Sequence, residues 1–227
     1  MRAIIVGDIH GQSVQFDRLL RYADFSPDAD KLILLGDLID RGEDSYGVIR
    51  RVMYLKEKMG SRLVVLRGSH ERLLLSPCLR DRLLWRLVGK SASVRSFKAH
   101  GESLSDYAGW IRENTVLYHA EPYFQCAHAA VKIEPISEND EHTLMMDHFT
   151  VKKNRYAGRL TLTGHIHLGQ PTFYDGCGGK GIFLPYQELL PLPEHGVICL
   201  DTGCGKVGRN LTGMVTDGKR YRLISVP

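Results

Sequence analysis

The first third of the chain alternates short apolar runs with longer apolar stripes at helical spacing. Residues 4–6, 32–35 and 63–66 are runs of Ile, Leu and Val, which are typical of buried strands. Between these runs, apolar residues recur at intervals of three and four over 16–23 and 48–59, which predicts helices. This order predicts a βαβαβ unit whose strands form a parallel or mixed sheet.

The middle of the chain and a later segment differ from this pattern. Residues 72–115 are predicted to be mostly helical, with Pro77 interrupting the first part, and we expect this helical region to cap one end of a functional site. Residues 168–196 are rich in Gly and Pro, which predicts a long loop excursion over the surface. Because no repeat or linker divides the sequence, we expect a single domain over 1–227.

Later apolar runs predict that the chain returns to β structure. Strands are predicted at 123–128, 160–164 and 197–201. The segment NLTGMVTDGKRYRLISV alternates in polarity on either side of Asp217-Gly218, and this dipeptide between alternating segments is a strong hairpin signal. The fold class is therefore α/β.

The composition is that of a folded protein with a sizeable core. Of the 227 residues, 43% are hydrophobic and 25% are charged, which excludes a disordered chain. No apolar run approaches the roughly 18 residues of a membrane helix, so we expect no membrane partner. The start, MRAIIVGDIHG, lacks the features of a secretory signal, and we expect a cytoplasmic protein.

Cysteine usage and net charge narrow the class further. Five cysteines without a CxxC motif cannot close a complete disulfide framework, so we interpret them as reduced thiols. The net charge of +4 is too small and too scattered for a nucleic-acid partner. These features leave the oligomeric state open.

Chemistry-bearing residues follow the predicted strands in five places. The motifs are GDIHG at 7–11, GDLIDRG at 36–42, GSHE at 68–71, AHA at 127–129 and GHIH at 164–167. In open α/β sheets, ligands collect beyond the carboxyl ends of the strands, and carboxylates with imidazoles bind divalent metals. The side chains expected to converge there are Asp8, His10, Asp37, His128, His165 and His167. The glycines of these motifs are expected to let each strand end in a sharp turn.

These motifs resemble the calcineurin-like metallophosphoesterases. GDIHG with GDLIDRG is similar to the phosphoprotein phosphatase branch, which includes bacterial and bacteriophage-lambda-type Ser/Thr phosphatases and symmetrical diadenosine tetraphosphatases. The resemblance covers nearly the whole chain, down to LDTGCGKVGRNLTGMVTDG at 200–218. It implies a β-sandwich of mixed sheets flanked by helices, with a dinuclear metal site at the C-terminal ends of the strands.

The resemblance also implies a set of metal ligands. Asp8 and His10 would bind the first metal, and Asp37 would bridge both metals. The second metal would be bound by His128 and His165. In many members of the superfamily the second histidine of GHxH, here His167, touches the first metal. The resemblance favours Mn²⁺, although the same ligands accommodate Fe or Zn.

A shared anionic ligand offsets the repulsion of two dications, and a hydroxide between them is a nucleophile for in-line attack on phosphorus. Arg41 is suited to bind phosphoryl oxygens and stabilise charge in the transition state. His70 is the expected general acid for the leaving group, with Asp40 orienting it and raising its pKa. Arg41 and His70 are therefore the expected substrate-binding residues.

Two departures from the family pattern stand out. Ser69 occupies the position where the family has a metal-ligating asparagine, so we expect a weaker second metal site. Bacterial members also carry a second phosphate-binding arginine between the AHA-like and GHx motifs, which this chain lacks in that context. Arg155, Lys152 and Lys153 are candidates to replace it, and the spacing does not choose among them.

The interpretation we prefer from the sequence is a metal-dependent phosphomonoester hydrolase, with phosphoserine and phosphothreonine in proteins as substrate. An alternative is the hydrolysis of dinucleoside polyphosphates or nucleotides. A further alternative is a metal-binding regulatory module with reduced turnover, for which Ser69 is the only support. Hydrolysis assays with an aryl phosphate, a phosphopeptide and diadenosine tetraphosphate distinguish the three.

Overall fold

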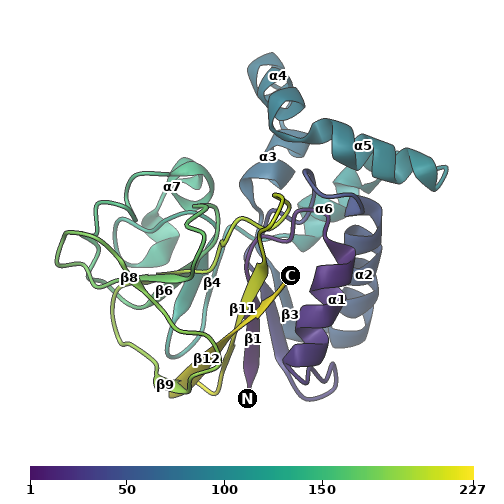
Figure 1. Ribbon diagram of the computed structural model, residues 1–227. Helices are drawn as coiled ribbons and strands as arrows, with labels where there is room; N and C mark the ends of the chain where they lie inside the picture. The colour runs from purple at the N-terminus through teal and green to yellow at the C-terminus, as the bar shows by residue number, and fades with distance from the viewer.

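Two six-stranded mixed sheets pack face to face in the computed structural model, which describes residues 1–227 (Figure 1). The strand order of the first sheet is β3-β2-β1-β11-β12-β9. Its strands are β1 (Ala3–Val6), β2 (Lys31–Leu34), β3 (Leu63–Val65), β9 (Leu190–Pro191), β11 (Leu211–Thr216) and β12 (Arg220–Val226). The sheet is parallel across β1, β2 and β3 and antiparallel from β1 onward through β11 and β12.

The second sheet has the strand order β4-β5-β6-β10-β7-β8. Its strands are β4 (Tyr118–Ala120), β5 (Gln125–Ala127), β6 (Thr161–Thr163), β7 (Thr172–Tyr174), β8 (Ile182–Phe183) and β10 (Val197–Cys199). The strands β5, β6 and β10 are parallel to one another, so their carboxyl ends meet at one edge. The α/β sandwich of mixed sheets predicted from the sequence is confirmed.

The two sheets enclose one hydrophobic layer, and the helices enclose another. In β1, Ile5 packs in the layer between the sheets, whereas Ile4 and Val6 pack on the side of the helices, as the period of two in a strand requires. The helices α1 (Ser13–Tyr22) and α2 (Ser45–Met59) cover that side. Both faces of the strand are buried, which explains why its sequence is a continuous apolar run.

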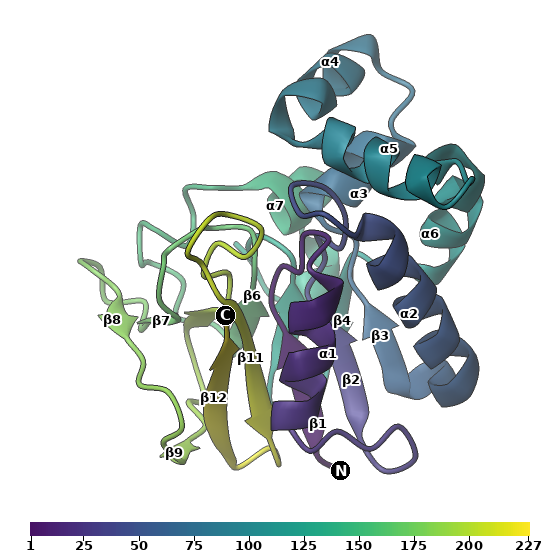
Figure 2. The ribbon, with the colours of Figure 1, turned by 45° about the vertical axis from the view of Figure 1, so that its right-hand side comes forward.

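The predicted helical region forms several short helices at the top of the molecule. These are α3 (Ser69–Leu75), α4 (Leu79–Val88), α5 (Lys90–Ala99), the 3₁₀ turn Leu104–Tyr107 and α6 (Ala108–Asn114). Figure 2 shows that α4 and α5 project beyond both sheets, and we refer to residues 79–99 as the arm. No helix of the structure is both long and apolar enough to cross a lipid bilayer.

The structure differs from the sequence prediction in several elements. The predicted loop 168–196 contains β7, β8 and β9, which are only two or three residues long and therefore leave no periodic signal. β4 and the helix α7 (Glu141–Met146) were not predicted. The β11–β12 hairpin around Asp217 is confirmed, and all five cysteines are free thiols.

Candidate metal centre

The loops that follow β1, β2, β3, β5 and β6 bring the predicted ligands together at one edge of the sandwich. Three of these residues, His10, Asp37 and His165, adopt left-handed backbone conformations with φ of 46°, 48° and 63°. Few non-glycine residues adopt such conformations, and those that do cluster at functional sites. The backbone therefore turns at the residues that carry the chemistry.

Two groups of potential ligand atoms lie in this edge. One group is His10, Asp37 and His70, and the other is Asp37, His128 and His165; within each group the ligand atoms lie within 4.8 Å of one another. All of these residues are buried. Asp37 is the member that both groups share, which is the position expected of a bridging carboxylate.

Asp8 lies beside these groups. Its Oδ2 is 3.9 Å from the Nε2 atom of His10, and both of its carboxylate oxygens accept hydrogen bonds of 3.1 Å from the backbone N–H of His165. Gly164 makes this approach possible, because a β-carbon there would overlap the Asp8 carboxylate. Gly164 is thus required for close packing, and the left-handed residue at this strand end is His165, which follows it.

Three imidazole nitrogens in the centre lack any hydrogen-bond partner. They are the Nε2 atoms of His10, His128 and His165, all buried. The opposite nitrogen of His10 lies 2.9 Å from the carbonyl oxygen of Ile39, and that of His128 lies 2.7 Å from the carbonyl oxygen of Leu35. Donation by Nδ1 leaves Nε2 as the atom that faces the centre, which is the arrangement of metal-ligating histidines. The residues present therefore fit divalent cations.

The charge balance of the centre leads to the same conclusion. The carboxylates of Asp8, Asp37, Asp40, Glu71 and Asp201 are all buried, and no lysine or arginine is buried with them. Buried charges are stable in proteins only when they are paired or coordinate a metal. Without a cation, burial raises the pKa of Asp8 well above its ordinary value and that of Glu71 to about 7, so protons take the place that bound cations would fill.

The pKa values of the histidines divide them into two kinds. Burial lowers the pKa of His10 and of His165 to about 3, so both rings are neutral and able to donate a lone pair. For His128, burial acts in the same direction, but the carboxylates of Asp37 and Asp8 outweigh it and raise the pKa to about 10. A cation bound at His128 would therefore replace a proton.

His70 and Asp40 form a hydrogen-bonded pair next to the first group. The Nδ1 atom of His70 lies 2.6 Å from Oδ2 of Asp40. Asp40 is held by the indole N–H of Trp85, which donates to Oδ2 at 2.6 Å, and by the hydroxyl of Ser93, which donates to Oδ1 at 2.6 Å. The arm thus fixes the carboxylate that orients His70.

Arg41 and His167 lie at the exposed rim of the centre. The guanidinium of Arg41 contacts His167 through Nη1 at 2.8 Å and His70 through Nη2 at 3.3 Å. The other nitrogen of His167, Nδ1, lies 2.7 Å from Oδ2 of the buried Asp201. His167 is therefore near the centre, but it belongs to neither group of ligand atoms.

Ser69 faces Asp37 directly. Its hydroxyl donates a hydrogen bond of 3.0 Å to Oδ2 of Asp37, and the backbone N–H of His70 donates one of 2.8 Å to Oδ1. Ser69 thus directs its hydroxyl at the carboxylate that both groups of ligand atoms share.

Three residues of the centre were missed in the sequence. Glu71 accepts hydrogen bonds from the backbone N–H groups of Asp37, Leu38 and Gly68, and so holds two of the motif loops together. Asp201 contacts His167 from the end of β10. The ring of His148 stacks on that of His165 with the ring centres 4.2 Å apart. Glu71 and Asp201 each follow a predicted strand within a quoted motif, so their positions in the sequence could have indicated them. No pattern in the sequence indicates His148.

A family model agrees with this site. The model of the calcineurin-like phosphoesterases matches residues 1–176, which include the five motifs from GDIHG to GHIH but not Asp201. Two curated relatives are both named symmetrical bis(5'-nucleosyl)-tetraphosphatase. The protein of Acidovorax sp. (strain JS42) is 33% identical over 53% of this chain and 50% of its own length. That of Glaesserella parasuis serovar 5 is 34% identical over 59% of this chain and 46% of its own length.

The chain spans about half the length of these curated relatives. Solved structures share its fold more completely. A metallophosphoesterase from Sphaerobacter thermophilus covers 100% of this chain, and the chain covers 89% of it, with a TM-score of 0.70 and 14% identity. A protein serine/threonine phosphatase from Saccharomyces cerevisiae covers 99% of this chain, and the chain covers 79% of it, with a TM-score of 0.64 and 12% identity. At such low identity these matches establish the fold alone.

Proposed function

The chain belongs to the calcineurin-like phosphoesterase family, and from this premise we propose that it is a metal-dependent hydrolase of dinucleoside polyphosphates. The observation that carries the hydrolase proposal is the set of three buried imidazole nitrogens without partners, arranged around a shared aspartate. Such a set is costly in a folded protein unless cations complete it.

We assign the metal ligands from the contacts in the centre. Asp8 and His10 would hold one divalent cation, Asp37 would be shared, and His128 and His165 would hold the other. His167 and Ser69 border these positions and are proposed as outer members of the set. Bound cations would supply Lewis-acid activation of water and of the phosphoryl oxygens. We propose Mn²⁺ as the metal, with Fe and Zn as the alternatives to test.

His70 is proposed to donate the proton that the leaving group requires. Burial opposes protonation of its ring, but Asp37 and Asp40 raise the pKa of His70 above its ordinary value. The hydrogen bond between Asp40 and Nδ1 keeps Nε2 directed toward the rim, where Arg41 lies. When a phosphate oxygen takes the place of Arg41 beside Nε2, His70 can hold the proton there that the leaving oxygen requires.

Arg41 is proposed to bind the phosphoryl group. Its guanidinium lies between His70 and His167, and it forms no ion pair with a carboxylate of the protein. The planar fork of arginine matches two phosphate oxygens. Arg41 can therefore orient the phosphorus between the metal ligands and the proton donor.

The substrate class is supported by the relatives. Both curated relatives described above carry the name symmetrical bis(5'-nucleosyl)-tetraphosphatase, and this name favours the alternative over the phosphoprotein substrate that the sequence led us to prefer. Symmetric cleavage of a tetraphosphate would leave two phosphates on each nucleoside. The yeast phosphatase does not support the phosphoprotein interpretation, because its likeness is one of fold.

Hydrolysis by the purified chain tests the proposal. The chain is reconstituted with Mn²⁺, Fe²⁺ or Zn²⁺ and assayed with diadenosine tetraphosphate, a phosphothreonine peptide and an aryl phosphate. We expect the dinucleotide to be cleaved to adenosine diphosphate with the highest kcat/KM, and His70→Asn to lower kcat by roughly 10²- to 10⁴-fold. The matched control is His195→Ala, since His195 is an exposed histidine far along the 168–196 segment.

Each alternative has its own outcome in this experiment. A higher kcat/KM for the phosphopeptide would overturn the dinucleotide substrate and restore the phosphoprotein interpretation. Metal binding without turnover of any of the three substrates would overturn the hydrolase proposal in favour of a regulatory module.

A further inference from the structure

The loop between β10 and β11 borders the candidate metal centre. A β-carbon at Gly205 would lie 2.8 Å from Cβ of His10 and 3.2 Å from Cβ of Arg41, so the loop passes directly over these two residues. The thiol of Cys204 contacts the carbonyl oxygen of Ile9 at 3.4 Å, and the backbone N–H of Gly203 donates to Asp201 at 2.8 Å. The loop is therefore held against the centre by the close approach of Gly205, by the thiol of Cys204 and by the backbone N–H of Gly203.

Arg209 folds back from the end of this loop onto the same rim. A β-carbon at Gly203 would lie 3.3 Å from Cγ of Arg209, and one at Gly169 would lie 2.5 Å from its Nη1 atom. Gly169 is two residues after His167, whose ring contacts Arg41 at 2.8 Å. The glycines thus let the side chain of Arg209 pass close to the backbone of the rim, with Nη1 nearest to Gly169.

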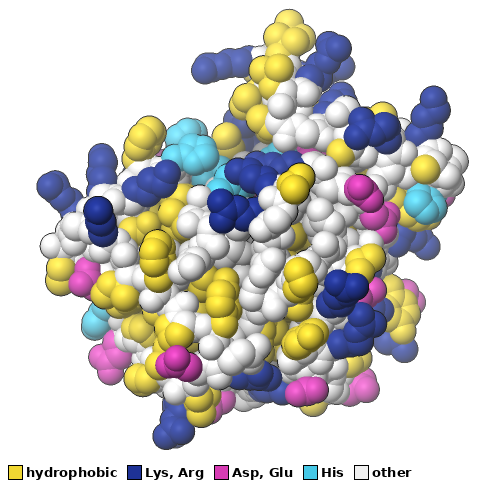
Figure 3. Space-filling view, in the orientation of Figure 1, with side chains coloured by type: hydrophobic (Ala, Val, Ile, Leu, Met, Phe, Trp, Pro, Cys, Tyr) yellow, Lys and Arg dark blue, Asp and Glu magenta, His cyan; other side chains and the backbone are white.

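The guanidinium of Arg209 has no partner within the protein. It forms no ion pair, its nitrogens form no hydrogen bond with the rest of the chain, and the residue is exposed. Figure 3 shows Lys and Arg side chains beside exposed histidines in the notch below the arm, with no acidic side chain among them. A free guanidinium beside a phosphate-binding centre is suited to a second phosphate group.

We propose that Arg209 binds the phosphate chain of the substrate at the phosphate next to the one that is attacked. This inference rests on the proposed function, and it gives Arg209 the role of a specificity residue that selects polyphosphates over monoesters. Arg41 holds the phosphoryl group at His70, and Arg209 holds its neighbour across the loop Gly203–Gly205. A phosphate monoester has no second phosphate and gains nothing from Arg209.

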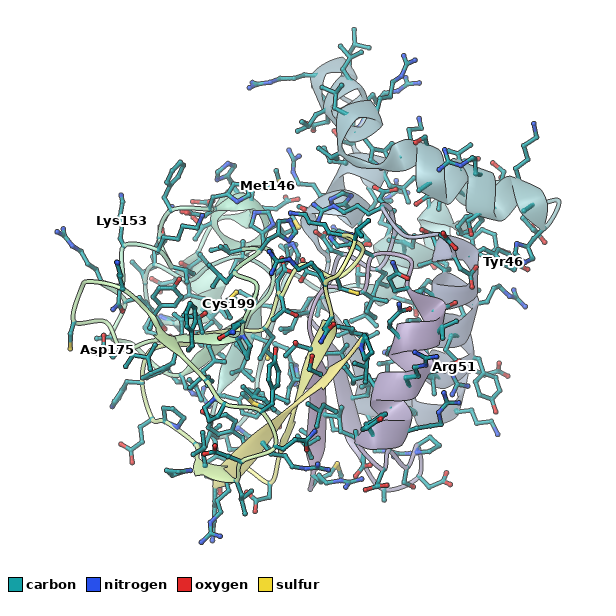
Figure 4. The ribbon with its side chains drawn as sticks, in the orientation of Figure 1. Tyr46, Arg51, Met146, Lys153, Asp175 and Cys199 are labelled. Atoms are coloured by element: carbon teal, nitrogen blue, oxygen red, sulfur yellow. The ribbon has the colours of Figure 1, made fainter.

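The three basic residues considered from the sequence are less suited to this role. Lys152, Lys153 and Arg155 are exposed in the segment that follows α7. Figure 4 places Lys153 at the outer edge of the molecule, on the side opposite α1 and α2. Their segment is joined to the centre through His148, whose ring stacks on His165, whereas Arg209 packs on the rim itself.

The experiment compares Arg209→Ala with the matched control Arg21→Ala, since Arg21 is an exposed arginine in the last turn of α1. The metal-loaded full chain is assayed with diadenosine tetraphosphate and with an aryl phosphate, and the binding of inorganic tripolyphosphate is measured by calorimetry. We expect Arg209→Ala to raise the KM for the dinucleotide and the Kd for tripolyphosphate about tenfold, the equivalent of one charged hydrogen bond. The kinetics with the aryl phosphate should stay within about twofold, and Arg209→Lys should restore part of the loss.

Two results would overturn the proposal. An unchanged Kd for tripolyphosphate in Arg209→Ala would exclude the contact, and an equal loss with both substrates would mean that Arg209 only supports the loop. Failure of the proposed function gives a different result, because the unmodified chain then does not cleave the dinucleotide. The tripolyphosphate measurement still decides whether Arg209 binds phosphate.

Discussion

The metal centre and the arm are opposite kinds of region, and a few hydrogen bonds join them. In the centre, polar atoms are buried without partners, as at the Nε2 atoms of His10 and His165. On the arm, apolar side chains are exposed, with Leu79 at 69% and Leu87 at 84% of full exposure. An exposed leucine is common on a protein surface and costs little, whereas a buried unpaired polar group costs about 1–3 kcal/mol. Buried polar atoms without partners therefore mark a functional site more reliably than exposed apolar side chains do.

Among the changes that distinguish the two regions, Asp37→Asn in the centre should have the largest effect on turnover. This change removes the shared carboxylate, and we expect turnover to fall more than about 100-fold, since even residues that only support metal ligands are worth 10- to 100-fold. Thermal denaturation with and without metal checks the reason for the loss. Saturating metal should raise the melting temperature of the unmodified chain and leave that of Asp37→Asn almost unchanged. An equal rise in both proteins would show that Asp37 does not bind metal.

The centre should also respond to pH in a way that the arm does not. Because Asp37 and Asp8 raise the pKa of His128 to about 10, the metal must displace a proton at neutral pH. The raised pKa belongs to a group that is protonated below pH 10, so metal affinity should increase with pH, by about tenfold per unit for one released proton. Calorimetry in buffers of different ionisation enthalpy measures the proton release. Metal affinity independent of pH between 6 and 8 would contradict this prediction.

Trp85→Phe tests the connection between the regions. The indole N–H of Trp85 donates to Asp40, which holds His70, so its loss should reduce kcat about tenfold while KM changes little. The pH profile of kcat should shift as well, because the hydrogen bond and charge of Asp40 help to raise the pKa of His70. The matched control is Trp110→Phe, on α6, because no hydrogen bond joins its indole to the centre. If both variants behaved alike, the arm would play no part in catalysis.

A smaller effect is expected within the centre at Ser69. Asparagine reaches farther than serine and presents a carbonyl oxygen, so Ser69→Asn should tighten the second metal site about fivefold, the value of one neutral contact of about 1 kcal/mol. Activity at limiting metal should rise with it. Unchanged metal stoichiometry and unchanged turnover at limiting metal would rule out a weak second site.

The smallest effect is expected on the arm. Leu87→Ser removes an apolar side chain that is already exposed, so the free energy of unfolding should change by less than about 0.5 kcal/mol. Turnover should stay within about twofold, as measured with the dinucleotide substrate. A larger loss of activity would mean that the arm contacts substrate.

The centre was predictable from the sequence to the extent that its residues follow apolar strands. Asp8, Asp37 and His165 each lie directly beyond such a run, and parallel strands bring their carboxyl ends together. The contact between Asp201 and His167 depends on β10 lying next to β6 in the second sheet, a pairing that no local pattern encodes. The hydrogen bond from Trp85 to Asp40 depends likewise on how the arm packs.

The order of strands in the first sheet has a consequence for biosynthesis. β1, which delivers Asp8, lies between β2 and β11, and its register with β11 pairs Ala3 with Thr216, more than 200 residues farther along the chain. Ribosomes add roughly 5–20 residues per second, so the first strand made waits on the order of ten seconds or more for its second neighbour. Until then one edge of β1 is open to wrong pairing. A nascent chain of this protein should therefore need protection by chaperones until the final hairpin leaves the exit tunnel.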